Sequence, residues 1–144
     1  MALRYKLTIF LLISLFISLL ITSHTYPQNQ QDSSPPEKTT LVEAVMCESI
    51  KDFTPQDQAI LFSIGIGRIS CFTSFDPVLE ETHIYHNWFR RDKLSTRLKL
   101  SLHPPRWSTF SSIQLREADQ GAWRVEITDK DGRILRLLRF SITD

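Results

Sequence analysis

The sequence has few of the residues that build metal, redox and nucleotide sites. It contains 2 cysteines and 4 glycines in 144 residues, with no C-x-x-C and no H-x-x-x-H spacing. A structural zinc site needs four closely spaced ligands, and a dinucleotide loop needs a third glycine after Gly65 and Gly67. A hydrolase of the α/β type needs a G-x-S-x-G elbow, which is also missing. We therefore expect no metal and no cofactor.

A clear excess of charge of one sign is missing as well. Lys and Arg number 17 and Asp and Glu 16, and two of the bases, Arg4 and Lys6, precede the domain, which leaves 15 against 16. A near-neutral domain lacks the basic surface that attracts nucleic acids or anionic membranes. The sequence therefore predicts no nucleic-acid partner.

The N-terminal residues have the pattern of a leader. Arg4 and Lys6 precede an uncharged apolar run at residues 7–21, after which the chain becomes polar. This order is typical of a signal peptide, and as a helix the run would span roughly 23 Å, short of the ~30 Å membrane core. No A-x-A-like cleavage site follows, so a single-pass membrane anchor through residues 7–21 is the alternative. In both cases we expect an N-terminal hydrophobic helix within residues 1–24. The rest of the chain is then periplasmic or otherwise extracytoplasmic, tethered to the inner membrane or released.

Residues 25–40 separate the leader from the domain. They are rich in Gln, Ser, Pro and Thr, and from Pro27 on they contain no aliphatic side chain. This composition predicts an extended, disordered linker. The remaining residues, 41–144, are enough for one domain with a two-layer core.

The domain has the pattern of short β-strands. Trp88, Trp107 and Trp123 lie in segments where large apolar and polar residues alternate, and Asp131-Gly132 is a strong tight-turn signal. Residues 54–57 are expected to begin a turn or one short helix. The expected strands are 41–47, 60–66, 68–75, 82–90, 94–102, 107–113, 123–128 and one after the turn. Without a long amphipathic helix, this pattern predicts an all-β, antiparallel sandwich of immunoglobulin-like type.

The alternation also predicts which side chains form the core. We assign Trp107 and Trp123 to the structural core, the latter in phase with Val125 and Ile127. In the final strand the apolar phase changes between Leu137 and Leu138, which predicts a bulge there. The cleanest alternation places four side chains inward: Leu94, Leu98, Leu100 and Leu102.

Several motifs together resemble the bacterial domain-of-unknown-function family 2914. They are Cys47, residues 67–73 (GRISCFT), His86-Asn87-Trp88, residues 106–112 (RWSTFSS), residues 121–127 (GAWRVEI) and Asp131-Gly132. The resemblance spans residues 41–142 and implies an envelope-associated β domain without an assigned activity. Members commonly carry a basic residue after the indole of the Arg-Trp element and a Lys after the Ser-Ser pair. This chain has Ser108 and Ile113 at those positions, a difference that bears on any ligand held by the bases.

Cys47 and Cys71 are each expected on the apolar face of a strand. In an oxidising compartment we expect a disulfide between them, which would close a loop of ~25 residues and stabilise the fold by roughly 3.5 kcal/mol. The alternative is a pair of buried free thiols in neighbouring strands, which behave as small apolar groups.

A polar groove beside Trp88 would suit a sugar or a peptide, because an indole stacks on an apolar ligand face while fixed donors flank it. Its candidate ligand-binding residues are His86, Trp88, Arg106, Ser108, Ser111 and Ser112. The alternative is that His86 is half-buried and bonded to a backbone carbonyl or to a serine such as Ser111 or Ser112.

We therefore expect a non-catalytic binding module of the cell envelope, whose partner is another envelope protein or a cell-wall component. The alternative is a small envelope enzyme that acts on polysaccharide, which would need two carboxylates facing each other across a cleft. The acids stand instead at positions typical of turns, so we assign no catalytic residue. These acids are Asp76, Glu80, Glu81, Asp129 and Asp131.

Overall fold

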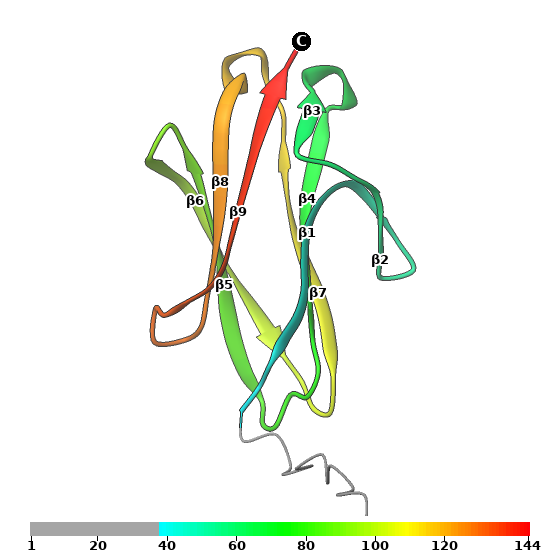
Figure 1. Cartoon of the computed structure of the whole chain (residues 1–144), viewed down its shortest axis with the longest axis vertical. Helices are drawn as coiled ribbons and strands as arrows, with labels where there is room; N and C mark the ends of the chain where they lie inside the picture. The colour runs from blue at the N-terminus through cyan, green and yellow to red at the C-terminus, as the bar shows by residue number, and fades with distance from the viewer. Residues whose placement is uncertain (1–37) are drawn as a thin grey trace, which may run out of the picture. The chain divides into compact units, whose positions relative to one another are not determined.

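The computed structural model describes residues 38–144, which form two β-sheets (Figure 1). The four-stranded sheet contains, in spatial order, β2 (Thr54–Gln58), β1 (Leu41–Lys51), β4 (Arg68–Phe75) and β7 (Trp107–Gln114). The five-stranded sheet contains β3 (Leu61–Ser63), β9 (Ile134–Thr143), β8 (Gly121–Thr128), β5 (Thr82–Arg90) and β6 (Lys93–Leu102). Two short 3-10 helices are η1 (Ile64–Ile66) and η2 (Glu117–Asp119). The prediction of an all-β sandwich is confirmed.

The predicted leader at 1–24 and residues 25–37 of the predicted linker lie outside the described residues. Among residues 38–144, no helix combines the length and the apolar character needed to cross a membrane.

Two segments differ from their predicted structure. Residues 54–58 form strand β2, because Asp52 and Phe53 both adopt positive φ angles, 49° and 54°, and close a tight hairpin with β1. The strand expected at 60–66 stops at Ser63, whose side chain accepts a hydrogen bond from the backbone N–H of Gly65 and caps η1. The short β3 pairs with β9 in parallel, so the sandwich is not wholly antiparallel.

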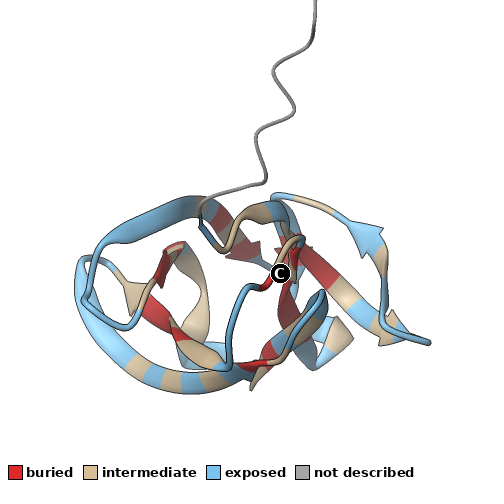
Figure 2. Ribbon diagram, turned by 90° about the horizontal axis from the view of Figure 1, so that it is seen from below, coloured by how far each residue is buried: buried red, intermediate tan, exposed pale blue. Residues whose placement is uncertain are grey.

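The core lies between the two sheets, and Figure 2 shows buried positions on strands of both. Phe140 on β9 stands at its aromatic centre. Its ring meets those of Phe62 and Trp88 edge-on, with centroids 6.0 and 6.1 Å away, and stacks on Trp123 at 6.2 Å. Trp123 is 5% exposed, which confirms its assignment to the core. Trp107 is 38% exposed because it opens the edge strand β7, so its assignment to the core was wrong.

Two strands change phase where a bulge interrupts the pairing. On β6, Leu98, Leu100 and Leu102 point inward as predicted, but Leu94 does not. The register shifts between Trp88 and Phe89 of β5, so Leu94 lies opposite Phe89 on the outer face.

On β9, the register shift falls opposite Ile127 and Thr128, which places the extra residue at Leu135. The bulge predicted at Leu137 and Leu138 is therefore two residues away. Leu138 lies opposite the inward Val125, whereas Leu137 follows the outer face, opposite Glu126.

Candidate functional site

The six predicted groove residues do not lie together. Three of them form a hydrogen-bonded network in the interior, where His86 and Trp88 are fully buried and Ser111 almost so. The Ser111 hydroxyl lies 2.8 Å from Nδ1 of His86 and accepts a hydrogen bond from Nε1 of Trp88 at 3.0 Å. Nε2 of His86 lies 3.3 Å from the hydroxyl of Thr73 on β4. This contact agrees with the alternative prediction of a histidine bonded to a serine, but the ring is fully buried and not half-buried.

The pair of Ser111 and His86 has the composition of a nucleophile and its base, but it cannot meet a substrate. Burial lowers the pKa of His86 to about 3, so the ring is neutral at physiological pH. Both ring nitrogens of His86 are within hydrogen-bond distance of hydroxyl groups, and the Ser111 hydroxyl oxygen also accepts a hydrogen bond from the indole N–H of Trp88. The network joins β5 to the opposite sheet, so its role is to fix how the two sheets pack.

The other three residues of the predicted groove lie elsewhere. Ser108 and Ser112 belong to β7 but face away from the core, because side chains alternate along a strand and Ser111 faces inward. Their hydroxyls bond to those of Ser74 and Ser70 on β4, at 3.0 and 2.7 Å. Arg106 is exposed just before β7. The groove is therefore not formed by these residues.

Cys47 and Cys71 are free in the structure, contrary to the predicted disulfide. In the β1–β4 pairing Cys71 lies opposite Met46, whereas Cys47 lies opposite Ser70, so the two thiols project from opposite faces of the sheet. The thiol of Cys47 donates to the carbonyl of Ser70 at 3.7 Å. Burial raises the pKa of Cys47 to about 11 and also raises that of Cys71, so neither is poised as a nucleophile.

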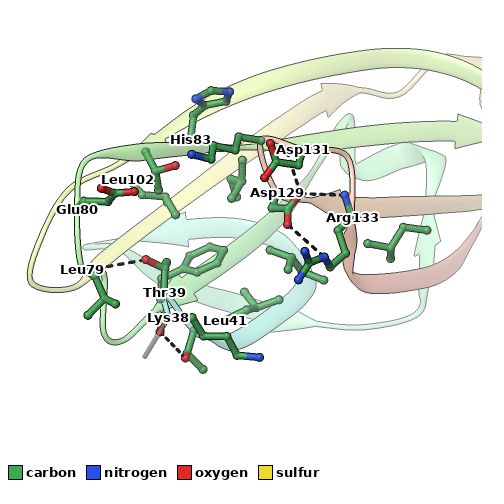
Figure 3. A pocket seen from close by; sticks show the side chains of 17 residues that line it. Lys38, Thr39, Leu41, Leu79, Glu80, His83, Leu102, Asp129, Asp131 and Arg133 are labelled. Atoms are coloured by element: carbon green, nitrogen blue, oxygen red, sulfur yellow. Dashed lines mark hydrogen bonds and ion pairs between the residues drawn. The ribbon is translucent and has the colours of Figure 1, made fainter. Parts of the chain in front are cut away.

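A cleft of about 750 Å³ opens at the end of the sandwich where β1 and β5 begin (Figure 3). Its floor contains Phe75, Ile84 and Leu102, which are buried, apolar and contributed by both sheets. Ile134 and Leu135 at the start of β9 add exposed apolar surface to its wall. A volume of this size with an apolar floor and polar groups around it is found in small-molecule and peptide sites.

Charged groups of both signs surround the cleft. They come from the chain just before β1, from the loop between β4 and β5, and from the hairpin between β8 and β9 (Figure 3). The charged and ionisable lining residues are Lys38, Glu80, His83, Asp129, Lys130, Asp131 and Arg133.

Asp129 shapes the hairpin beside this cleft. Its carboxylate accepts hydrogen bonds from the backbone N–H groups of Asp131 and Arg133, at 3.0 and 2.8 Å, and lies 3.8 Å from Nε of Arg133. Gly132 supplies the positive φ, 84°, that the turn requires. The prediction that Asp129 serves turn chemistry is confirmed.

No sequence motif predicts the cleft. Its lining residues come from five separate parts of the chain, so no run of consecutive residues indicates it. The only available signal was an apolar pair, Ile134-Leu135, directly after a polar turn. Within residues 38–144, no group of three or more His, Cys, Asp or Glu side chains is arranged to hold a metal ion.

Comparison with known proteins gives one family. Residues 81–142 match the model of the family described as "Protein of unknown function (DUF2914)". The match begins just before β5 and ends within β9, so the motifs at Cys47 and residues 67–73 lie outside it. No curated protein matches the chain. The predicted resemblance is therefore confirmed over residues 81–142, where this chain matches DUF2914.

Proposed function

We propose that this protein is a non-catalytic binding module of the cell envelope and that the end cleft holds its ligand. The cleft itself carries the proposal, since an apolar floor shared by both sheets lies beneath a charged rim. Such a site suits a ligand that combines an apolar group with charges of both signs. A peptide segment of another envelope protein and a peptide-bearing cell-wall component both have this chemistry.

We also propose that the sandwich is of immunoglobulin-like topology. The order β1-β4-β7 corresponds to strands A, B and E of that fold, and β6-β5-β8-β9 corresponds to C′, C, F and G. Trp88 on β5 is fully buried, as is the tryptophan of strand C in immunoglobulin domains.

This correspondence supports a binding role for the cleft by analogy with immunoglobulin variable domains. In variable domains the antigen-binding loops B–C and F–G lie at one end of the sandwich. The equivalent connections here, between β4 and β5 and between β8 and β9, both line the cleft. Loops held by a rigid scaffold are common places for binding residues. The analogy supports a binding role and names no ligand.

The envelope location is part of the proposal and rests on the sequence of the leader. The basic residues Arg4 and Lys6 before the apolar run at 7–21 support export, with the leader either cleaved or kept as an anchor. The linker at 25–40 would then separate the domain from the leader. Protease added to intact spheroplasts should digest the domain, whereas a domain protected until lysis would contradict export.

The binding role can be tested with purified cell-wall sacculi as the probe. The full chain, kept in a nonionic detergent, is expected to sediment with the sacculi. Ile134→Asp should reduce this binding at least about tenfold, because it places an unpaired charge on the apolar wall of the cleft.

The matched control is Leu61→Asp. Leu61 is 59% exposed and Ile134 55%, but Leu61 lies on β3, outside the cleft. Equal loss in both variants, with unchanged melting curves, would show that the cleft is not the binding site. For a protein partner, a photoreactive amino acid at position 83 should form a cross-link in cells that the same group at position 68, on β4, does not form.

One observation favours the alternative, a small enzyme acting on polysaccharide. Glu80, Asp129 and Asp131, separate in the sequence, all line the same cleft. Carboxylates across a cleft are what such hydrolases use. Asp129 is held by its turn, which leaves Glu80 and Asp131 as candidates. Release of reducing ends from the sacculi by the parent, abolished by Glu80→Gln or Asp131→Asn, would favour the enzyme.

A further inference from the structure

The two sheets carry very different charge. Strands of the five-stranded sheet contain seven basic residues and one acidic residue, Glu126, whereas those of the four-stranded sheet contain two basic and three acidic. The balances are therefore +6 and −1. The near-zero net charge of the chain hides this asymmetry, which would draw anions toward the five-stranded sheet.

The basic residues gather most closely at the hairpin between β5 and β6. A hollow of about 440 Å³ opens there, at the last residues of β5, whereas the cleft lies at the first residues of that strand. Within the described part of the chain, five residues line the hollow: Arg90, Arg91, Lys93, Leu94 and Ser95. The first three of these are basic. Thr82, at the cleft end of β5, is eight residues from Arg90, or roughly 26 Å along the strand.

The positive charge of this hollow is only partly neutralised by its neighbours. The acid at the hairpin tip, Asp92, pairs with Arg124 on the outer face of the sheet. Arg90 has one ion-pair contact, to Asp119 on η2, at a distance of 4.0 Å. Arg91 and Lys93 are exposed and form no ion pair with any residue of the described part of the chain.

Arg90 also has an unused donor. Its Nε is the one buried side-chain nitrogen or oxygen atom within residues 38–144 that lacks a hydrogen-bond partner. A buried donor without a partner is destabilising, so the guanidinium of Arg90, a residue that lines the hollow, is incompletely satisfied within the described residues.

We propose that this hollow, which we call the hairpin site, binds a phosphate group. Two guanidinium groups and one ammonium group can bind the terminal oxygens of one phosphate group together, and guanidinium groups match the geometry of phosphate oxygens closely. Ser95 adds a hydroxyl, and Leu94 adds an apolar side for the group that carries the phosphate. The proposal is independent of the cleft and of its ligand.

The test uses calorimetric titration of the full chain, in a nonionic detergent and at constant ionic strength. The probes are inorganic phosphate and glycerophosphoglycerol, a soluble phosphodiester, with chloride as the reference anion. The parent is expected to bind at least one probe saturably. Binding of inorganic phosphate alone would identify a phosphomonoester or the free anion as the source, and binding of the diester would identify a phosphodiester of a lipid or a polymer.

The variant Lys93→Gln should weaken this binding at least about tenfold, because it removes one charge-assisted contact. The matched control is Lys99→Gln, an identical change on the same strand, also exposed, about 20 Å from Lys93 and therefore beyond the screening length. It should leave the affinity within twofold of the parent. The absence of saturable binding of both probes, or equal weakening by Lys93→Gln and Lys99→Gln, would overturn the proposal.

Discussion

At the scale of single residues, His86 shows how burial turns a candidate ligand into part of the core. The sequence places it next to Trp88, where a histidine can serve either a site or the interior. The structure puts both of its nitrogens against hydroxyl groups of the opposite sheet. A residue of this kind stabilises the fold only while it stays neutral, since protonation would place a charge in the core.

The pH dependence of stability should therefore carry a signature of His86. In the unfolded chain this ring takes up a proton below its ordinary pKa of 6.5, whereas the folded protein resists protonation down to about 3. The unfolded state binds more protons in this window, so the free energy of unfolding falls as the pH falls, by up to ~1.4 kcal/mol per pH unit.

Urea unfolding between about pH 5 and pH 6.5, followed by tryptophan fluorescence, measures this slope. In His86→Gln the free energy of unfolding should be lower at neutral pH, and its dependence on pH in this window should be weaker. The other histidines are common to both proteins and cancel in the comparison. Identical slopes would show that His86 is not held neutral.

The two cysteines make a second prediction at this scale. Because their thiols project from opposite faces of the sheet and both are buried with raised pKa values, they should neither form a bond nor react in the folded protein. Alkylation in native buffer should leave both unmodified, and alkylation in denaturant without reductant should modify both. If alkylation in denaturant required a reductant, the two cysteines would be bonded to each other and the prediction of free thiols would be wrong.

At the scale of strands, the alternation of apolar and polar residues predicted most elements and failed where a bulge shifts the pairing. Leu98, Leu100 and Leu102 point inward as expected, yet Leu94 on the same strand does not. A bulge lies in the pairing between two strands, so the sequence of one strand alone does not locate it. In β9 the sequence shows a phase change, but the bulge lies at Leu135 and not at Leu137 and Leu138, for the same reason.

The tryptophans give the prediction that belongs to this scale. Trp123→Ala on β8 should lower the free energy of unfolding by about 3–5 kcal/mol, because it removes the stacking surface of Phe140 and leaves a cavity. The indole nitrogen would also cease to donate to the carbonyl of Asp119, a contact of 2.6 Å.

The comparison variant is Trp107→Ala on β7. Much of its ring is already in water, so the loss should be only about 1–2 kcal/mol. Chemical unfolding of the two variants measures both values. Equal losses would contradict the different burial of the two rings.

At the scale of the whole molecule, a near-neutral chain has a polarised charge distribution. The net charge of the domain predicts no basic surface, but seven basic residues lie on the strands of one sheet. Net charge contains no information on where the charged residues lie. Their distribution between the two sheets depends on the order in which the strands pair.

This asymmetry should be visible in ion-exchange chromatography at neutral pH. The double variant Lys99→Gln and Arg139→Gln should elute from a cation exchanger at lower salt than Lys51→Gln and Arg68→Gln. Both pairs remove two exposed charges, but only the first pair belongs to the five-stranded sheet. Equal elution of the two double variants would mean that the charge distribution has no effect on binding to an anionic matrix.

The β class, most strands, the β8–β9 hairpin and the resemblance confirmed over residues 81–142 can all be predicted from the sequence alone. These depend on local alternation, on turn chemistry such as Asp131-Gly132, and on short motifs, all of which are written in consecutive residues. Four features depend on tertiary contacts: the free state of the two cysteines, the burial of His86 and Ser111, the position of the cleft and the position of the hairpin site. Each of these depends on which strands become neighbours and in what register, and a shift of one residue exchanges the inner face of a strand for the outer one.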